Sequence, residues 1–436
     1  MSLNIRRNVS TNVVAFFINI ALTFIGYRMV VQQGGTAALG VWSALSAAIF
    51  VIRLGDVGMG SSAERHVAMV DATAQPLKAR GYLDTALLIN SLLFLILACV
   101  GWLILSFKIE WIVPDNQNLQ LEALHLLPLM LVVFVISNIA NVLSGGLRGL
   151  HLVYITAYLS IGGAILQLLV ILILVPRLGI AGLAWAQLAQ NIFIAILAWY
   201  YFNKKLKSSL SLSLSLSLSL VSWLPTQCQK LYFRELFSFS MRSQVVNLIN
   251  GLFEPISKFL VGHSSGMATL GIFEIAYKIV SLPRNAVVSG VMGITPAITK
   301  LLLTEKTEAI RLYRKAKKMV IIATGAVLLC VVLTSPVMSY LLLHKIDSTL
   351  IIFISILAVG FWFNAIGAPA YTLGFAFGKM KSNMISASMS VVSLVLFGLL
   401  TQVWSSLYGA VVACGLSLML GGFFILFLNE KLLKDA

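Results

Sequence analysis

Long apolar stretches, each close to 20 residues, recur along the whole chain and are separated by short polar segments. A hydrocarbon core about 30 Å thick is crossed by roughly 20 apolar helical residues, so each stretch predicts one membrane-spanning helix. The twelve predicted spans are residues 11–31, 36–55, 82–106, 124–143, 154–175, 180–202, 238–262, 267–293, 318–343, 348–374, 384–403 and 407–428. The expected fold is therefore all-α, a polytopic membrane protein with twelve transmembrane helices.

The composition supports a membrane protein. Of 436 residues, 59% are hydrophobic and only 11% are charged, against about 25% charged in soluble domains. The 31 Lys plus Arg outnumber the 15 Asp plus Glu, but their distribution argues against nucleic-acid binding. If the N-terminus lies inside the cell, the outside loops hold only Lys108, Arg177 and Lys345. This positive-inside asymmetry predicts a multi-pass membrane protein with both termini in the cytoplasm.

The N-terminus and the cysteines add two expectations. MSLNIRRN before the first apolar stretch resembles the start of a signal peptide, but no A-x-A-like cleavage site follows, so we expect the first span to be retained. Cys99, Cys330 and Cys414 fall within spans, and Cys228 lies in a predicted cytoplasmic loop. A disulfide framework is therefore not expected.

The chain contains an internal repeat. GTAALGVW, from Gly35 to Trp42, matches GMATLGIF, from Gly266 to Phe273, at an offset of 231 residues. Chance similarity among small apolar residues is the alternative explanation. Because a repeat of six helices crosses the membrane an even number of times, both copies would enter in the same direction. That predicts a pseudo-two-fold axis along the membrane normal, with a binding site between the halves.

The repeat divides the chain into three parts. We expect an N-terminal six-helix half at residues 1–202, a cytoplasmic linker at residues 203–233 and a C-terminal six-helix half at residues 234–436. The linker contains SLSLSLSLSLSL from Ser209 to Leu220. Strict alternation is compatible with an amphipathic strand at the interface, whereas low complexity favours a spacer.

Charged residues inside the spans are confined to the first, seventh and eighth. These residues are Arg28, Arg242, Glu254, Lys258, Glu274, Lys278 and Arg284. A charge at mid-membrane costs about 2.5 to 3.5 kcal/mol, so these side chains need a wet or protein-lined place. Because the repeat makes spans one and two equivalent to seven and eight, one shared polar cavity would accommodate them all. Five basic and two acidic side chains leave a net charge of +3, which favours an anionic ligand.

The spacing of these charges leaves a second interpretation open. Glu254 with Lys258, and Glu274 with Lys278, stand four residues apart with Glu on the N-terminal side, which is the favourable order on a helix. The pairs alone could serve only to neutralise each other so that two helices insert. That interpretation does not cover Arg28, Arg242 and Arg284.

Motifs for nucleotide or metal chemistry do not match. GFAFGKM, from Gly374 to Met380, is one residue too short for a phosphate-binding loop and lacks Ser or Thr after Lys379. No H-E-x-x-H occurs. We therefore expect no cofactor, no metal and no catalytic residue. Transport would be driven by an ion gradient of protons or Na⁺, by a substrate gradient or by a partner protein.

Three features together resemble the bacterial polysaccharide (O-antigen) flippase family. They are the two six-helix halves, the charges on spans one, seven and eight, and the sequence LGDVGMGSSAERHVA after the second span. That family belongs to the multidrug, oligosaccharidyl-lipid and polysaccharide (MOP) exporter superfamily. Its local motif reads approximately D-x-G-L-G, a gap, then Arg. The matching residues here are Asp56, Gly58, Met59, Gly60 and Arg65, with Met in place of Leu. The resemblance implies a MATE-like fold of two pseudo-symmetric halves.

The resemblance implies a flippase rather than an enzyme. Its substrate would be an undecaprenyl-pyrophosphate-linked oligosaccharide, an O-antigen or similar repeat unit, moved across the bacterial cytoplasmic (inner) membrane by alternating access. Membrane lipids and other polysaccharide-assembly membrane proteins would be partners, and nucleic acid would not. One alternative is a small-molecule multidrug antiporter of the same superfamily. Another is a polytopic polysaccharide polymerase or ligase acting at the periplasmic face.

Roles for individual residues follow from this resemblance and from side-chain chemistry. Arg and Lys bind phosphate and acidic-sugar oxygens through charge-assisted hydrogen bonds. The expected substrate contacts are Arg28, Lys258, Lys278 and Arg284, with Arg242 as an entry contact nearer the cytoplasm. The candidates for proton or cation coupling are Glu254 and Glu274. The candidates for a cytoplasmic gate are Asp56 and Arg65, for which an ordinary role in a solvated loop is the alternative.

Overall fold

The computed structural model of the chain describes residues 5–56, 58–70, 75–115, 117–208, 230–292, 298, 300–301, 304–377, 380–403 and 408–434. Within the described helices, some side chains are not described, among them those of residues 5–16 and 237–247. The Ser-Leu repeat at residues 209–220, for which a strand and a spacer are the two interpretations, lies outside the described residues.

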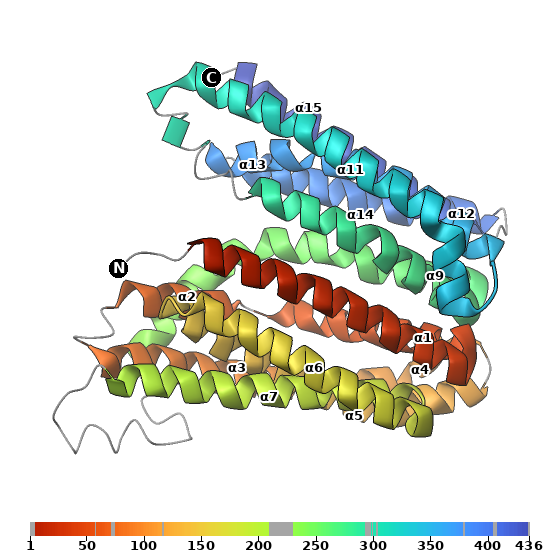
Figure 1. Cartoon of the computed structure of the whole chain (residues 1–436), viewed down its shortest axis with the longest axis horizontal. Helices are drawn as coiled ribbons and strands as arrows, with labels where there is room; N and C mark the ends of the chain where they lie inside the picture. The colour runs from red at the N-terminus through yellow and green to blue at the C-terminus, as the bar shows by residue number, and fades with distance from the viewer. Residues whose placement is uncertain are drawn as a thin grey trace. The chain divides into compact units, whose positions relative to one another are not determined.

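Helices make up all the regular secondary structure of the described residues (Figure 1). The elements are α1 (Ile5–Ile52), η1 (Arg53–Gly55), α2 (Met59–Met69), α3 (Pro76–Phe107), α4 (Ile109–Ile112), α5 (Gln117–Gly149), α6 (Val153–Leu178), α7 (Ile180–Ser208), α9 (Lys230–Met292), α11 (Lys306–Leu343), α12 (Ser348–Ile366), α13 (Ala368–Ala376), α14 (Met380–Val403) and α15 (Gly409–Lys434). Ten helical segments of the described residues are long and apolar enough to cross a membrane. The chain is thus an all-helical, multi-pass membrane protein.

Two of these ten segments each contain two predicted spans. α1 breaks at Gly35, with φ 72° and ψ −175°, and α9 breaks at Gly266, with φ 79° and ψ 171°. Positive φ is readily adopted only by residues without a Cβ, so glycine permits the chain to reverse between two helical pieces without a longer loop. Counting the pieces of α1 and α9 separately, the described residues contain the twelve predicted membrane-crossing helices.

Three details differ from the sequence prediction. The segment after the second span, expected as a loop, contains the helix α2. Its buried residues Met59, Ala63 and Val67 recur every four positions and form one apolar stripe. α11 begins at Lys306, well before the predicted start of its span at 318, because its first turns are polar and carry no hydropathy signal. The predicted span 348–374 is split between α12 and α13 near Gly367.

The chain forms two compact units. Unit 1 comprises Met1–Gln33, Ala48–Ile109 and Gln120–Val245, and unit 2 comprises Gly34–Ala47, Glu110–Leu119 and Val246–Ala436. The predicted division into halves at residues 1–202 and 234–436 stays a prediction.

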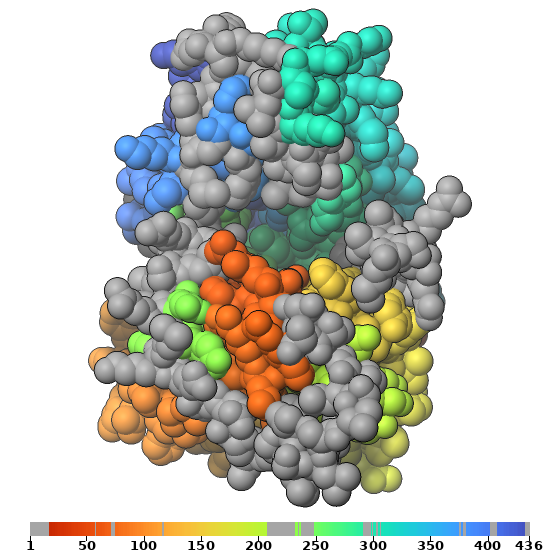
Figure 2. Space-filling model, turned by 90° about the vertical axis from the view of Figure 1, so that its left-hand side faces the viewer, coloured from red at the N-terminus to blue at the C-terminus, as the bar shows by residue number. Residues whose placement is uncertain are grey.

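The core of unit 1 is built from α2, α3, α5 and α7 around fully buried Leu83, Leu147 and Phe202. The start of α9 packs onto this core, because Ser62 Oγ donates a hydrogen bond of 2.9 Å to the carbonyl of Leu236. Figure 2 shows this end of unit 1, with the orange surface of α2 beside the green surface of the start of α9. α6 and α7 lie side by side (Figure 1).

In unit 2, α12 packs against α11 and α15, and α15 packs against α14. Small residues bring these helices close together. A Cβ on Gly360 would lie 2.7 Å from the Gly415 carbonyl oxygen, and one on Gly422 would lie 2.3 Å from the Phe363 carbonyl oxygen. Close backbone approach at small residues is a common means of helix association in membranes, where the hydrophobic effect does not drive helices together.

Candidate functional site

A chain of ion pairs in unit 2 joins four of the predicted site residues. Lys258 Nζ lies 2.8 Å from Glu254 Oε1 and 2.8 Å from Glu274 Oε2. Lys278 Nζ lies 2.8 Å from Glu254 Oε1. At the other end, Ser43 Oγ donates a hydrogen bond of 2.7 Å to Glu274 Oε2. The order is therefore Lys278, Glu254, Lys258, Glu274 and Ser43.

The pairing is partly as expected from the spacing. Glu254 and Lys258 form the predicted i, i+4 pair. The other two ion pairs, Lys258 with Glu274 and Lys278 with Glu254, link the piece of α9 before the Gly266 break to the piece after it. The reversal at Gly266 lets the two pieces present these side chains to each other, which spacing along one straight helix does not predict.

The two ends of the chain of ion pairs differ in exposure. The side chains of Lys258 and Glu274 are 5% and 2% exposed, whereas those of Lys278 and Glu254 are 25% and 34% exposed. Lys258 and Glu274 therefore form a buried inner pair. Glu254 and Lys278 line a cavity.

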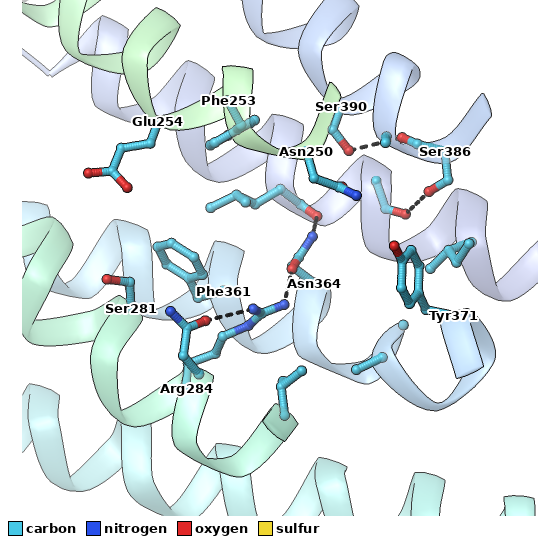
Figure 3. A pocket seen from close by; sticks show the side chains of 18 of the residues that line it. Asn250, Phe253, Glu254, Ser281, Arg284, Phe361, Asn364, Tyr371, Ser386 and Ser390 are labelled. Atoms are coloured by element: carbon cyan, nitrogen blue, oxygen red, sulfur yellow. Dashed lines mark hydrogen bonds between the residues drawn. The ribbon is translucent and has the colours of Figure 1, made fainter. Parts of the chain in front are cut away.

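This cavity has a volume of about 410 Å³ and lies among α9, α12, α13, α14 and α15 of unit 2 (Figure 3). It is lined by three charged residues, Glu254, Lys278 and Arg284, and by several uncharged polar ones. The uncharged polar residues include Asn250, Ser281, Asn285, Asn364, Tyr371, Asn383, Ser386 and Ser390. Its size falls within the range of roughly 300 to 1,000 Å³ that small-molecule sites occupy.

Arg284 is the most distinctive residue of the cavity. Its Nη2 donates to Asn364 Oδ1, and its Nη1 donates to Asn285 Oδ1 at 2.9 Å (Figure 3). The guanidinium carbon lies 5.9 Å from the centre of the Phe361 ring. Its Nε is buried and has no hydrogen-bond partner among the described residues. Since the lining holds Lys278 and Arg284 against Glu254, the cavity offers a net positive charge and an unused donor.

The uncharged polar residues that line this cavity were not predicted from the sequence. Ser386 Oγ donates to the Gly421 carbonyl at 2.8 Å, and Asn383 Nδ2 donates to the Tyr371 carbonyl at 3.1 Å. Asn364 Nδ2 donates to the Leu418 carbonyl at 3.4 Å. A sequence signal exists, because Ser386 and Ser390 recur at i, i+4 within an otherwise apolar span and therefore share one helix face.

The remaining charged candidates lie elsewhere in the chain. Arg28 is half-buried in the first piece of α1, in unit 1. The helical backbone at Arg242 belongs to α9 in unit 1, and its side chain lies outside the described residues, so its role as an entry contact stays a prediction.

The predicted gate residues lie in unit 1, Asp56 just before α2 and Arg65 within it. Asp56 Oδ1 accepts a hydrogen bond of 2.8 Å from the amide of Gly58, which has φ 73° at the start of the helix. Burial raises the pKa of Asp56, against the opposing effects of the Gly58 amide and the Arg53 charge. Arg65 is exposed on α2. The gate itself stays a prediction.

Two glycines of α5 bring this helix close to α2. A Cβ on Gly145 of α5 would lie 2.4 Å from the Gly60 carbonyl oxygen, and one on Gly149 would lie 2.6 Å from the Glu64 carbonyl oxygen. α2 and α5 thus approach backbone to backbone. The salt bridge between Arg148 Nε and Glu64 Oε2, at 2.7 Å, ties the same two helices together.

The chain is similar to known proteins in two respects: it matches a family model, and it shares a fold with solved structures. The family model for "Polysaccharide biosynthesis protein" matches residues 5–302. No curated protein matches the chain. An inward-facing multidrug resistance MATE family transporter of the MOP superfamily has a similar structure, with TM-score 0.80, 15% sequence identity and 98% coverage of each chain.

Two further structures share this fold at 15% identity. An outward-facing multidrug resistance MATE family transporter of the MOP superfamily has a TM-score of 0.68, covering 98% of this chain and 96% of its own. The other is a MOP superfamily transporter from Pyrococcus furiosus, with a TM-score of 0.68 and the same coverage of both chains. It is described as having a binding pocket of reverse polarity that suggests a different function. The chain therefore belongs to the polysaccharide biosynthesis protein family and has the fold of the MOP superfamily transporters, as the sequence resemblance predicted.

Proposed function

We propose that this protein is a flippase that translocates undecaprenyl-pyrophosphate-linked oligosaccharide across the bacterial cytoplasmic membrane. The observation that carries this proposal is Arg284, whose buried Nε has no partner among the described residues while its guanidinium lines a cavity within membrane-spanning helices. A cation is retained at such depth chiefly for a ligand or transport pathway. A pyrophosphate oxygen would accept the unused hydrogen bond and balance the positive charge.

The physical requirement for flipping is to move a polar headgroup through an apolar layer. The polyprenyl chain can stay in lipid, whereas the pyrophosphate and sugars need a path lined by hydrogen-bonding groups. Lys278 and Arg284 would contact the pyrophosphate. The buried Lys258 would hold Glu254 and Glu274 in place rather than reach the substrate, because its ammonium group already bonds both carboxylates.

Coupling to an ion gradient would act through Glu254. This carboxylate lines the cavity and is 34% exposed, whereas Glu274 is buried behind it. A proton or Na⁺ arriving at Glu254 would compete with Lys278 for the same oxygen and release that ammonium group toward the substrate. Both termini would lie in the cytoplasm, as the positive-inside distribution predicts.

A multidrug antiporter is the second candidate, and the fold shared with MATE family transporters favours it. The cavity charge opposes it where the drug is a cation, since Lys278 and Arg284 outnumber Glu254 in the lining. A flippase and a drug exporter therefore differ in the sign of the ligand that Arg284 would accept.

The test is complementation of a strain in which this gene is deleted. Arg284→Gln and Lys278→Gln remove one positive charge each from the cavity, and Arg311→Gln removes one from an exposed position on α11 whose side chain is 80% exposed. We expect the two cavity variants to lose surface polysaccharide and to accumulate lipid-linked repeat units in the cytoplasmic leaflet. Arg311→Gln should complement fully, and all three should be present in the membrane.

Three results would contradict the proposal. Normal surface polysaccharide with the combined Arg284→Gln and Lys278→Gln variant would remove the anion site from the mechanism. Unpolymerised repeat units already on the outer face of the deletion strain would indicate a polymerase or ligase. Unchanged polysaccharide together with a new sensitivity to cationic drugs would indicate the antiporter.

A further inference from the structure

Unit 1 has a second polar cavity, of about 500 Å³, among α1, α5, α6 and α7. Its polar lining consists almost entirely of uncharged side chains. These are Asn19, Asn141, Ser144, Thr156, Ser160 and Asn191. Small or apolar residues, including Ala140, Ala157 and Ile194, complete the wall. All four helices are long and apolar enough to span the membrane, so this group of amides and hydroxyls stands out against its surroundings.

The hydrogen-bonding capacity of this lining exceeds what the protein uses. Asn19 Nδ2 donates to Ser160 Oγ at 3.3 Å, and Asn191 Nδ2 donates to the Gln187 carbonyl at 2.8 Å. The side chains of Asn141 and Ser144 have no hydrogen-bond partner among the described residues, and the same holds for Asn191 Oδ1. Each of these groups faces a cavity large enough for a ligand.

The one charge in the lining of this cavity is balanced by a carboxylate outside the lining. Its single charged residue is Arg148, whose Nε is paired with Glu64 Oε2 at 2.7 Å. The unit 2 cavity, in contrast, is lined by Lys278 and Arg284 against Glu254. The two cavities therefore suit different chemistry. Amide and hydroxyl groups, which both donate and accept, match the vicinal hydroxyls of a sugar, and they give no advantage to an anion.

We propose that the unit 1 cavity binds uncharged sugar residues of the lipid-linked oligosaccharide and determines which glycans are accepted. This inference rests on the proposed flippase function and adds a specificity site separate from the anion site. Rejection of a wrong sugar would come from leaving the Asn141 side chain and Asn191 Oδ1 without partners in the cavity, a larger penalty than the loss of an apolar contact.

The test uses purified full-length protein in detergent and two probes. The first probe is undecaprenyl pyrophosphate without sugar, and the second is the host's own repeat-unit oligosaccharide released from its lipid carrier by mild acid. The variants Asn141→Leu and Asn191→Leu replace an amide by an apolar side chain of similar shape in the cavity. The matched control is Asn90→Leu in α3, which lies outside this cavity, is buried and has an unpartnered Nδ2.

We expect the two cavity variants to bind the released oligosaccharide at least about tenfold more weakly, equivalent to roughly 1.4 kcal/mol, and undecaprenyl pyrophosphate normally. Arg284→Gln should show the reverse pattern, and Asn90→Leu should bind both probes as the wild type does. Normal binding of undecaprenyl pyrophosphate also shows that a variant is folded.

Failure of this inference can be separated from failure of the proposed function. If the wild type binds undecaprenyl pyrophosphate but not the oligosaccharide, or if both Asn→Leu variants bind the oligosaccharide normally, the sugar site is wrong and the flippase proposal stands. If the wild type binds the oligosaccharide but not undecaprenyl pyrophosphate, the flippase proposal is wrong, and the variants still decide whether the cavity binds sugar.

Discussion

Gly40 and Gly271 occupy equivalent positions of the internal repeat, and each packs directly against the backbone of the other's helix. A Cβ on Gly40 would lie 1.9 Å from the Met267 carbonyl oxygen, and one on Gly271 would lie 1.9 Å from the Thr36 carbonyl oxygen. Thr36 and Met267 are themselves equivalent at the repeat offset of 231 residues. The contact therefore has local two-fold symmetry within unit 2, which contains both segments.

A side chain at either glycine should prevent this packing. Gly40→Ala and Gly271→Ala would force two backbones apart, which we expect to destabilise the fold by more than about 3 kcal/mol. Gly290→Ala is the matched control, because a Cβ there meets nothing within 4 Å. The measurement is thermal unfolding of detergent-purified protein, with the yield of monodisperse protein as a second readout. Equal stability of all three variants would show that the contact is not as close as described.

The number of membrane-spanning helices was more predictable from the sequence than the residues at which the helices begin and end. The twelve spans were predictable because bilayer thickness fixes the length of an apolar helix. The repeat aligned Gly35 with Gly266, and these are the two residues at which α1 and α9 reverse. Element ends were less predictable where amphipathic helices such as α2 continue into polar sequence.

The candidate site was predicted only in part. Charges within spans stand out, so Glu254, Lys258 and Arg284 could be identified. Their crosswise pairing could not, because it depends on how the two pieces of α9 face each other after Gly266. The uncharged amides and hydroxyls of both cavities were missed, since Asn and Ser also serve ordinary packing in membrane helices and carry no charge signal.

The buried inner ion pair should be structural. Lys258→Met would leave the carboxylate of Glu274, which is 2% exposed, without its cation, and we expect a loss of about 3 to 5 kcal/mol of stability. Adding Glu274→Gln should restore most of it, because the amide is uncharged and can still accept from Ser43. Lys278→Met should cost about 1 kcal/mol or less, because Glu254 keeps Lys258 and the site is partly solvated.

Thermal unfolding of the wild type and the three variants would check this prediction. A double variant no more stable than Lys258→Met would show that the inner pair is not the source of the loss. Lys278→Met provides a further contrast, since it should unfold near the wild-type temperature and still fail to support surface polysaccharide.

Asp115 should stabilise the reversal at Gly266. Its Oδ2 accepts a hydrogen bond of 2.8 Å from the amide of Met267, the first residue after the break. Asp115 therefore caps the N-terminus of the second piece of α9, although it lies far from that piece in the sequence. Asp115→Ala should lower stability by about 1 kcal/mol. Asp115→Asn should retain most of the effect, because its amide oxygen can accept the same bond. Equal melting temperatures for Asp115→Ala and the wild type would contradict the assignment.

Two aspartates outside the spans should give opposite pH dependences. Partial burial opposes ionisation of Asp347, but the hydrogen bond and charge of Lys345, 3.1 Å away, and the amides of Leu350 and Thr349 outweigh it and hold its pKa below the usual value. Its contribution to stability is therefore full above the unfolded-state value of about 4 and is lost as the pH falls through the folded-state pKa. Asp347→Asn should melt lower than the wild type at pH 7, by an amount equivalent to about 1 kcal/mol, and the difference should disappear in acid.

For Asp56 the sign is reversed. Burial raises its folded-state pKa, so ionisation opposes folding increasingly as the pH rises from about 4 through that pKa, and the full penalty is present above it. Asp56→Asn keeps an oxygen acceptor for the Gly58 amide and removes the buried charge. We therefore expect this variant to melt higher than the wild type at pH 7 and equally in acid. Melting curves from pH 3 to pH 8 would check both aspartates, and a lower melting temperature of Asp56→Asn at pH 7 would show that the carboxylate charge stabilises this turn.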